Sequence, residues 1–317
     1  MSKRLSWTLV MALLAAAAWA QPGPKAGVFF RPAPDKSASL PADQVFPKGR
    51  VFPFGFYSIH GLAATQQAKK DGVTLLGPVY GNKDAAVLAD AKEAGLPMVH
   101  TIGLPKEKVE EGKLTDEEII KAIREQVEKV KDEKAIAWWN LKPEELRSWR
   151  KPEMRYMELA AKTIRDTDPL KRPVWMYDPG HRSAKGLEPS ARNLDIVGKG
   201  MYTNYSGMKD SRVWCRWSIE QELAAIKAAN SKAVPIAVPE MFQQPKDPED
   251  VKLIPAWARH DVYAALVAGA QGVMVFSFAQ RKNFEARDAY YAAYAQVAAE
   301  LTGKLDLGRV FLFGERR

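Results

Sequence analysis

Short apolar runs alternate along the chain with longer stretches in which apolar residues recur at helical spacing. Eight of the runs are rich in β-branched or aromatic residues and have the length of buried strands. Because helical stretches separate most of them, the pattern predicts repeated β–α units and a parallel sheet. The predicted strands are Pro53–Ser58, Val73–Tyr80, Pro97–Ile102, Ala135–Leu141, Pro173–Tyr177, Leu194–Tyr202, Val234–Pro239 and Gly272–Phe278.

The helical stretches carry their own start signals. The clearest runs from Asp116 to Lys131, after Thr115 as N-cap and with Glu118 three residues on, which is the spacing of a capping box. A basic, apolar tail follows the last helix, and we expect it to pair with or cover the bottom of the fold. The other predicted helices are Pro152–Thr167, Ile219–Ala229, Trp257–Ala268 and Arg287–Leu301.

Eight strands, each followed by a helix or loop, predict a single-domain α/β fold of the (β/α)8 TIM-barrel type. Right-handed crossovers repeated eight times close such a sheet on itself. The alternative, a doubly wound open sheet, lacks support because no Gly-rich phosphate loop follows the first predicted strand.

The N-terminal residues predict export. Residues 1–20 combine Lys3 and Arg4, a short apolar run and Ala18-Trp19-Ala20, which together are typical of a signal peptide cleaved before Gln21. An uncleaved N-terminal anchor is the alternative. We expect residues 21–50 to form an extended lead-in, residues 51–317 the barrel and catalytic domain, and the mature protein to be secreted or periplasmic. No later run is long enough to span a bilayer.

Charge and cysteine content narrow the function classes. Loss of the two cations in residues 1–20 lowers the formal charge from +9 to +7. This excess favours solubility or attraction to an acidic polymer, and no nucleic-acid-binding motif accompanies it. The single cysteine, Cys215, excludes an intramolecular disulfide and is best read as a small packed residue.

Candidate binding residues gather where the predicted strands end, which is where barrels place their sites. Aromatic rings suit the C–H faces of sugars, and amides, imidazoles and carboxylates suit their hydroxyls. We therefore predict a carbohydrate substrate, possibly acidic. The histidines lack metal-ligand spacing, so no metal or other cofactor is expected. The candidates are Tyr57, His60, His100, Trp139, Asn140, Tyr177, His181, Arg182, Tyr202, Tyr205 and Phe278.

Four carboxylates are candidate catalytic groups. Glu240 closes the apolar run Val234–Pro239, where partial desolvation suits a nucleophile or an acid of raised pKa. Glycoside hydrolysis usually needs a second carboxylate, and Glu144 and Glu145 lie just past the fourth strand. The sequence does not separate these two. Asp178 is a further candidate, although Asp-Pro-Gly also reads as a turn.

Four segments, in their order along the chain, resemble the barrels of clan A glycoside hydrolases. In that family an acid/base Glu follows Asn at the end of strand four, and a nucleophilic Glu ends strand seven. Glu240 matches the second position. The first departs from the pattern, because Asn140 is followed by Leu141. The segments are Phe52–Tyr57, Ala137–Asn140, Asp168–Val174 and Ala264–Val273.

Three functions remain open at this point. The leading one is hydrolysis of glycosidic bonds in a polysaccharide or oligosaccharide, with Glu240 as nucleophile or base and Glu144 or Glu145 as proton donor. The second is a polysaccharide lyase acting on uronic-acid chains through a Tyr or His base. The third is a barrel that binds glycans without cleaving them. The residues available to a lyase are Tyr177, His181, Arg182, Tyr202 and Tyr205.

Overall fold

The computed structural model describes residues 39–81, 83–207 and 212–314, in which strands and helices alternate. Each strand falls in a predicted range, extending at most one residue past its end. β7 and β8 are two halves of one predicted strand. The strands are β1 (Phe54–Phe56), β2 (Leu75–Leu76), β3 (Met98–Gly103), β4 (Ile136–Lys142), β5 (Val174–Asp178), β6 (Ile196–Met201), β7 (Val234–Pro235), β8 (Val238–Pro239) and β9 (Val273–Val275).

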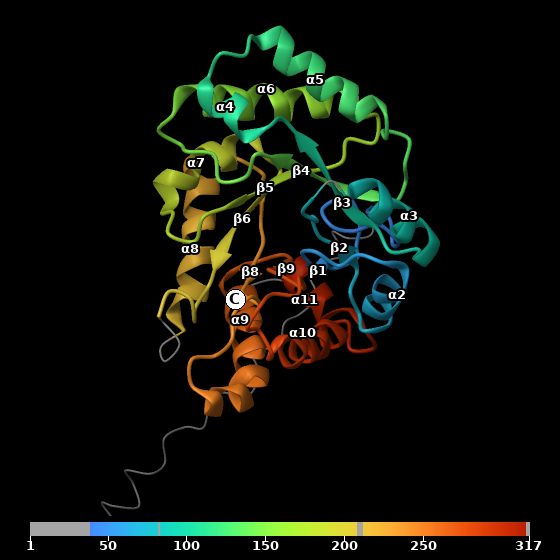
Figure 1. Cartoon of the computed structure of the whole chain (residues 1–317), viewed down its shortest axis with the longest axis vertical. Helices are drawn as coiled ribbons and strands as arrows, with labels where there is room; N and C mark the ends of the chain where they lie inside the picture. Colours follow the sequence, from blue (N-terminus) through green and yellow to red (C-terminus); the bar gives the residue numbers. More distant parts are fainter. Residues whose placement is uncertain (1–38, 82, 208–211, 315–317) are drawn as a thin grey trace, which may run out of the picture.

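The α-helices of the described residues follow one another around the outside of the strands (Figure 1). All five predicted helices are confirmed, and a short 3-10 helix, η1 (Pro248–Leu253), precedes α9. The α-helices are α2 (Leu62–Lys70), α3 (Asp84–Ala94), α4 (Lys106–Glu111), α5 (Asp116–Glu128), α6 (Lys151–Thr167), α7 (Ala184–Asn193), α8 (Val213–Ala228), α9 (Ile254–Ala268), α10 (Arg287–Thr302) and α11 (Leu307–Phe313).

Two helix starts show what the sequence pattern captured and what it missed. The capping box of α5 is present, since the Glu118 N–H donates to Thr115 Oγ1 (3.2 Å) and the Thr115 N–H donates to Glu118 Oε2 (2.8 Å). By contrast, α8 begins at Val213, six residues before the predicted start at Ile219. The extra turns bring Trp214 and Trp217 onto a helix.

The strands form one parallel sheet, in the order β7-β6-β5-β4-β3-β2-β1-β9, with β8 also paired to β6. The sheet is curled, and its two ends lie side by side. The Ala237 N–H donates to the Gly272 carbonyl (2.9 Å), and the Met274 N–H donates to the Ala237 carbonyl (2.8 Å). Glu240 makes a further parallel bridge with Phe276. An open, doubly wound sheet would leave two free edges here.

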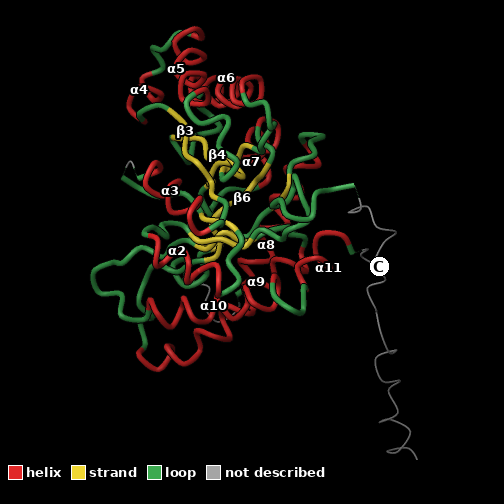
Figure 2. Tube along the Cα trace, turned by 90° about the vertical axis from the view of Figure 1, so that its right-hand side faces the viewer, coloured by secondary structure: helices red, strands yellow, loops and turns green. Residues whose placement is uncertain are grey.

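Both faces of the sheet are buried, so alternate residues of a strand enter different cores. In β4, Trp138 belongs to a small cluster inside the curled sheet, whereas Trp139 and Leu141 pack outward against the helices. This alternation follows from the two-residue period of a strand. In Figure 2 the strands accordingly run through the middle of the molecule, with helices around them.

The amino end of the sheet is closed by the lead-in and the tail. Val45 joins the inner cluster, and Trp138 Nε1 donates to the carbonyl of Phe46 (3.1 Å). The Phe46 ring meets the Phe313 ring of α11 edge-on, with centroids 6.1 Å apart. The prediction that the tail covers this end is therefore confirmed. The predicted signal peptide and most of the lead-in lie outside the described residues.

Candidate active site

A cavity of about 830 Å³ opens at the carboxyl ends of the strands. Segments that follow β2, β4, β5, β6, β8 and β9 all contribute to its lining. The cavity therefore lies where the ends of the predicted strands led us to expect a site. Of the residues predicted from sequence, the six that line this cavity are Glu144, Glu145, Tyr177, His181, Tyr202 and Tyr205.

Aromatic rings form one wall of the cavity, with Phe276 at their centre. Its ring lies 5.1 Å from that of Tyr57, 5.7 Å from that of Tyr202 and 5.8 Å from that of Phe242, measured between centroids. Tyr177 stacks on Tyr202, with centroids 6.1 Å apart and planes at 12°. Such rings offer the flat apolar surfaces on which the C–H faces of sugars pack.

Glu144 brings an acid to this wall. It follows β4, and the hydroxyl of the buried Tyr57 donates to its Oε1 (3.1 Å). Burial raises the pKa of Glu144 to about 7, against the lowering effects of the Tyr57 hydroxyl and the nearby Lys142 ammonium. A carboxyl group with this pKa holds its proton close to neutral pH, which is what a general acid requires.

Glu145 lies beside Glu144, exposed at the cavity edge, with a left-handed backbone (φ 61°). Arg182 holds this loop, because its Nη2 donates to the carbonyls of Glu145 (3.0 Å) and Leu146. Arg182 is itself buried and paired with Asp178, whose pKa burial raises to about 6. Arg182 and Asp178 therefore support the loop that carries both glutamates, and do not line the cavity.

Glu240 directly follows β8 as expected, but it does not line the cavity. It is 2% exposed. Oε1 accepts the backbone N–H of Asn204 (2.5 Å), and Oε2 accepts that of Tyr205 (3.1 Å). Burial raises the pKa of Glu240 to about 7, and these two N–H groups oppose the shift. The carboxylate thus fastens the loop between β6 and α8.

Two predicted binding residues face the outer helices. The indole of Trp139 is fully buried, donates to Asp168 (2.9 Å) and lies under the guanidinium of Arg172 (4.4 Å). His100 meets Trp139 edge-on, and burial lowers the pKa of its imidazole. Strand alternation accounts for both positions, because each side chain lies on the outward face.

The remaining predicted residues also lie off the cavity lining. Tyr57 and Asn140 are buried and absent from the lining, and the Asn140 side chain is close enough to Glu144 to lower its pKa. His60 is exposed at the rim, with Nδ1 3.0 Å from the Ser58 carbonyl. Phe278 packs edge-on against Tyr291, with centroids 5.2 Å apart.

Eight further residues line the cavity, and five of them have aromatic or charged side chains that were not among the predicted site residues. Phe276 and Phe278 are two residues apart, so strand alternation places both on the same face and could not tell which of them lines the cavity. Tyr80 and Phe242 stand at strand ends and carried a usable signal. Trp214 lies on α8 and Arg281 in the loop after β9, so a search limited to the ends of strands does not find them. The five are Tyr80, Trp214, Phe242, Phe276 and Arg281.

Two further findings concern the described ranges only. No group of three or more His, Cys, Asp or Glu side chains there is arranged to hold a metal ion. No helix in those ranges is long and apolar enough to cross a membrane.

Cys215 is buried and unpaired, with its sulfur 3.3 Å from Thr203 Oγ1.

No family model and no curated protein matches the sequence. Among solved structures, the chain is similar to glycoside hydrolases. A β-glucuronidase from Faecalibacterium prausnitzii has a TM-score of 0.59 at 15% identity over 82% of this chain and 51% of its own. A GH2 β-galacturonidase from Eisenbergiella tayi has a TM-score of 0.52 at 13% identity, covering 77% of this chain and 50% of its own.

A glucosidase from Croceicoccus marinus is similar over more of its own length. Its TM-score is 0.51 at 12% identity, covering 84% of this chain and 69% of that enzyme. The chain spans about half the length of the glucuronidase and galacturonidase it resembles. At such low identity the likeness establishes a shared fold with glycoside hydrolases, a curled parallel sheet surrounded by helices.

Proposed function

We propose that this protein is an exported glycoside hydrolase built on a closed (β/α)8 barrel. The barrel is supported by eight strand positions in sequential order, β7 and β8 counting as one, and by the hydrogen bonds of Ala237 to Gly272 and Met274 across the ends of the sheet. Export rests on the signal-peptide pattern of residues 1–20. The barrel domain would begin near residue 51.

The observation that carries the proposal is Glu144, a carboxyl group with a pKa of about 7 in a cavity walled by aromatic rings. The rings hold the sugar, and Glu144 donates a proton to the leaving oxygen of the glycosidic bond. Glu145 is the second carboxylate on the lining and would activate water or stabilise the developing positive charge on the sugar.

The clan A resemblance gives the nucleophile position to Glu240. We assign Glu240 instead to positioning, because both its oxygens are engaged by backbone N–H groups and it lies outside the cavity lining. It would hold Tyr205 and the segment around Tyr202 against Phe242, whose ring lies 4.9 Å from that of Tyr202. Glu240 would then act on substrate binding through the aromatic wall.

An acidic substrate is part of the proposal. Arg281 and His181 line the cavity, and the Arg281 guanidinium lies 5.4 Å from the Phe242 ring centroid, beside the aromatic wall. A cation at this place could receive the carboxylate of a uronic acid. The uronic-acid glycosidases among the structural neighbours make such substrates the first to test.

The lyase alternative is less well supported. It needs a tyrosinate or a histidine base, whereas burial raises the pKa values of the two candidate tyrosines Tyr177 and Tyr202 well above the ordinary range. Glycan binding without cleavage is favoured by one specific observation, which is that Glu240 lies outside the cavity lining.

The decisive experiment compares leaving groups. On glycosides with a basic leaving group, we expect Glu144→Gln to lower kcat/KM by roughly 10²–10⁴-fold, the usual contribution of a general acid. On a dinitrophenyl glycoside of the same sugar the loss should be small, because that leaving group departs without a proton. Glu125→Gln, on the exposed side of α5, is the matched control and should change neither rate.

Three outcomes would contradict the proposal in different ways. Equal losses of rate with both leaving groups would remove Glu144 from the role of proton donor. Products that absorb in the near ultraviolet, from a new conjugated double bond, would indicate a lyase. Tight glycan binding without any product from the wild-type protein would indicate a binding protein.

A further inference from the structure

A second pocket, of about 200 Å³, lies on the other side of the loops that wall the main cavity. In the β6–α8 loop, Asn204 lines the second pocket, whereas Tyr205 lines the main cavity. In the segment after β8, Gln243 lines the second pocket and Phe242 the main cavity. These two loops therefore form a common wall between the two hollows.

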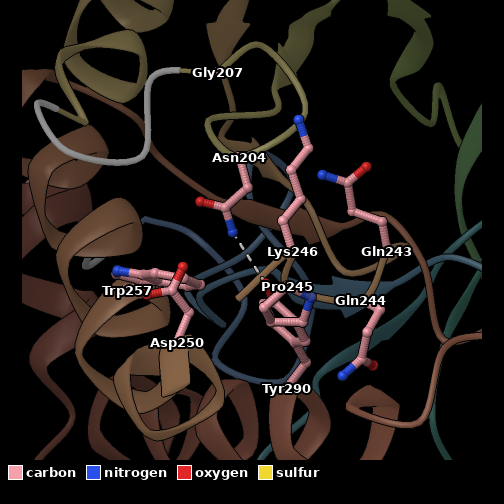
Figure 3. A pocket seen from close by; sticks show the side chains of 9 residues that line it. All are labelled: Asn204, Gly207, Gln243, Gln244, Pro245, Lys246, Asp250, Trp257 and Tyr290. Carbon is pink, nitrogen blue, oxygen red and sulfur yellow. Dashed lines mark hydrogen bonds between the residues drawn. The ribbon is translucent and has the colours of Figure 1, made fainter. Parts of the chain in front are cut away.

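The second pocket is built from side chains that the fold holds in place. Asn204 Nδ2 donates to the hydroxyl of Tyr290 (3.0 Å), and its Oδ1 accepts from Arg212 (2.9 Å). Arg212 is paired with the buried Asp261, and its guanidinium lies 5.0 Å from the ring centroid of Trp257. Figure 3 shows Trp257 on one side, Gln243 on the other, and the Asn204 amide facing Tyr290 between them.

Several polar groups of this pocket have hydrogen-bonding capacity left over. Tyr290 is 2% exposed and accepts from Asn204, yet no acceptor for its own hydrogen is found among the described residues. Gln244 Oε1 accepts the Ala286 N–H (2.8 Å), and no acceptor for its two amide hydrogens is found in the part of the chain that the structure describes. A buried donor without an acceptor costs about 1–3 kcal/mol. A ligand rich in oxygen acceptors would remove that cost.

We propose that this pocket is a second saccharide subsite that binds one sugar ring. Donors from Tyr290 and Gln244, the amide of Gln243 and the flat indole of Trp257 are the groups that recognise sugar hydroxyls and C–H faces. The volume lies below the roughly 300–1,000 Å³ of sites for drug-sized ligands, so a single ring fits better than a chain. The inference rests on the proposed function only for the choice of ligand class.

The common wall makes the two sites communicate. A ring bound against Asn204 and Gln243 stiffens the loops that also carry Tyr205 and Phe242 to the main cavity. Glu240 fastens the same wall by accepting the Asn204 and Tyr205 N–H groups. Occupation of the second subsite should therefore tighten binding in the main cavity, without a change in the chemistry at Glu144.

The test uses the whole protein labelled with 5-fluorotryptophan. The fluorine resonance of Trp257 reports the second pocket and that of Trp214 reports the main cavity, each assigned by its Trp→Phe variant. Neutral and uronic monosaccharides are titrated singly. We expect at least one of them to shift the Trp257 resonance saturably. Tyr290→Phe, which keeps the ring and removes the donor, should weaken that response by about tenfold, the effect of one hydrogen bond of roughly 1.4 kcal/mol.

The possible results separate a failure of the second subsite from a failure of the proposed hydrolysis. Gln243→Ala, a partly exposed position, gives a second variant that should also weaken the Trp257 response. No response of Trp257 to any sugar, or an unchanged response in both variants, would overturn the subsite. A response of Trp257 to sulfate or phosphate but to no sugar would also overturn it. Sugar binding at Trp214 without turnover would instead contradict the proposed hydrolysis and leave the subsite standing.

Discussion

Replacing Glu144 by Gln should make the protein more stable at alkaline pH while slowing the cleavage of glycosides that have a basic leaving group. An unfolded chain releases this proton near pH 4.5, whereas the folded protein keeps it until about pH 7. The folded state therefore binds more protons between these values, and the free energy of unfolding falls as pH rises through this window. Gln is neutral throughout and carries no such penalty.

The magnitude follows from the size of the pKa shift. A difference of this size corresponds to about 3 kcal/mol, at about 1.4 kcal/mol per unit of pKa. The side chain is half-buried, so water reduces the effect, and we expect about 2 kcal/mol for Glu144→Gln at pH 8. Below pH 4 the variant and the wild type should be equally stable, because the Tyr57 hydroxyl can still donate to the Gln side-chain oxygen.

Chemical unfolding followed by tryptophan fluorescence at pH 4, 6 and 8 measures this difference. Glu145→Gln is the matched control, and because Glu145 is exposed we expect its effect on stability to stay within about 0.5 kcal/mol at every pH. A Glu144→Gln variant that is less stable than the wild type at pH 8, or a difference that does not grow with pH, would refute the reasoning. The wild-type rate should in turn decline as pH rises above 7, because the general acid is then ionised.

Three other substitutions test the parts that hold the cavity. Glu240→Ala leaves two backbone N–H groups without an acceptor, at about 1–3 kcal/mol each, and should raise KM more than it lowers kcat; restoration of turnover by azide, with a glycosyl azide as product, would instead show a nucleophile. Arg182→Lys keeps a cation beside Asp178 but loses the planar guanidinium that binds the loop carbonyls. Denaturant titration should show the free energy of unfolding lowered by about 2–3 kcal/mol, together with slower turnover; wild-type stability would exclude its supporting role. Phe276→Ala removes the ring at the centre of the aromatic wall, and titration calorimetry should show weaker sugar binding with a stability loss of about 2–3 kcal/mol; unchanged affinity would place the sugar elsewhere.

Much of the fold could be predicted because its signals are local. Apolar runs located the strands to within a few residues, and Thr115 with Glu118 located the start of α5. The order of the elements predicted a parallel sheet with outer helices. The predicted start of α8 was wrong, because this helix begins at Val213, six residues before the predicted Ile219.

The candidate site, like the fold, was predicted in part from the sequence and decided in part by the tertiary structure. That carboxylates and aromatic residues gather at the strand ends was determined by the sequence, and Glu144, Tyr177 and Tyr202 do line the cavity. Which of these side chains reach the cavity was decided by tertiary structure. Trp139 is a strand-end aromatic residue as well, yet it packs between Asp168 and Arg172.

Glu240 and Arg182 show most clearly why a position at a strand end does not decide whether a side chain lines the cavity. Both are ionisable residues at strand ends that do not line the cavity, and both bind partners far along the chain: Asn204 lies 36 residues from Glu240, and Glu145 lies 37 residues from Arg182. The sequence by itself determined the strands, the helices and the face that carries the site. Only the tertiary structure decided which of the predicted carboxylates line the cavity, because Glu240 accepts hydrogen bonds from the backbone N–H groups of a distant loop, whereas Glu144 and Glu145 lie on the lining.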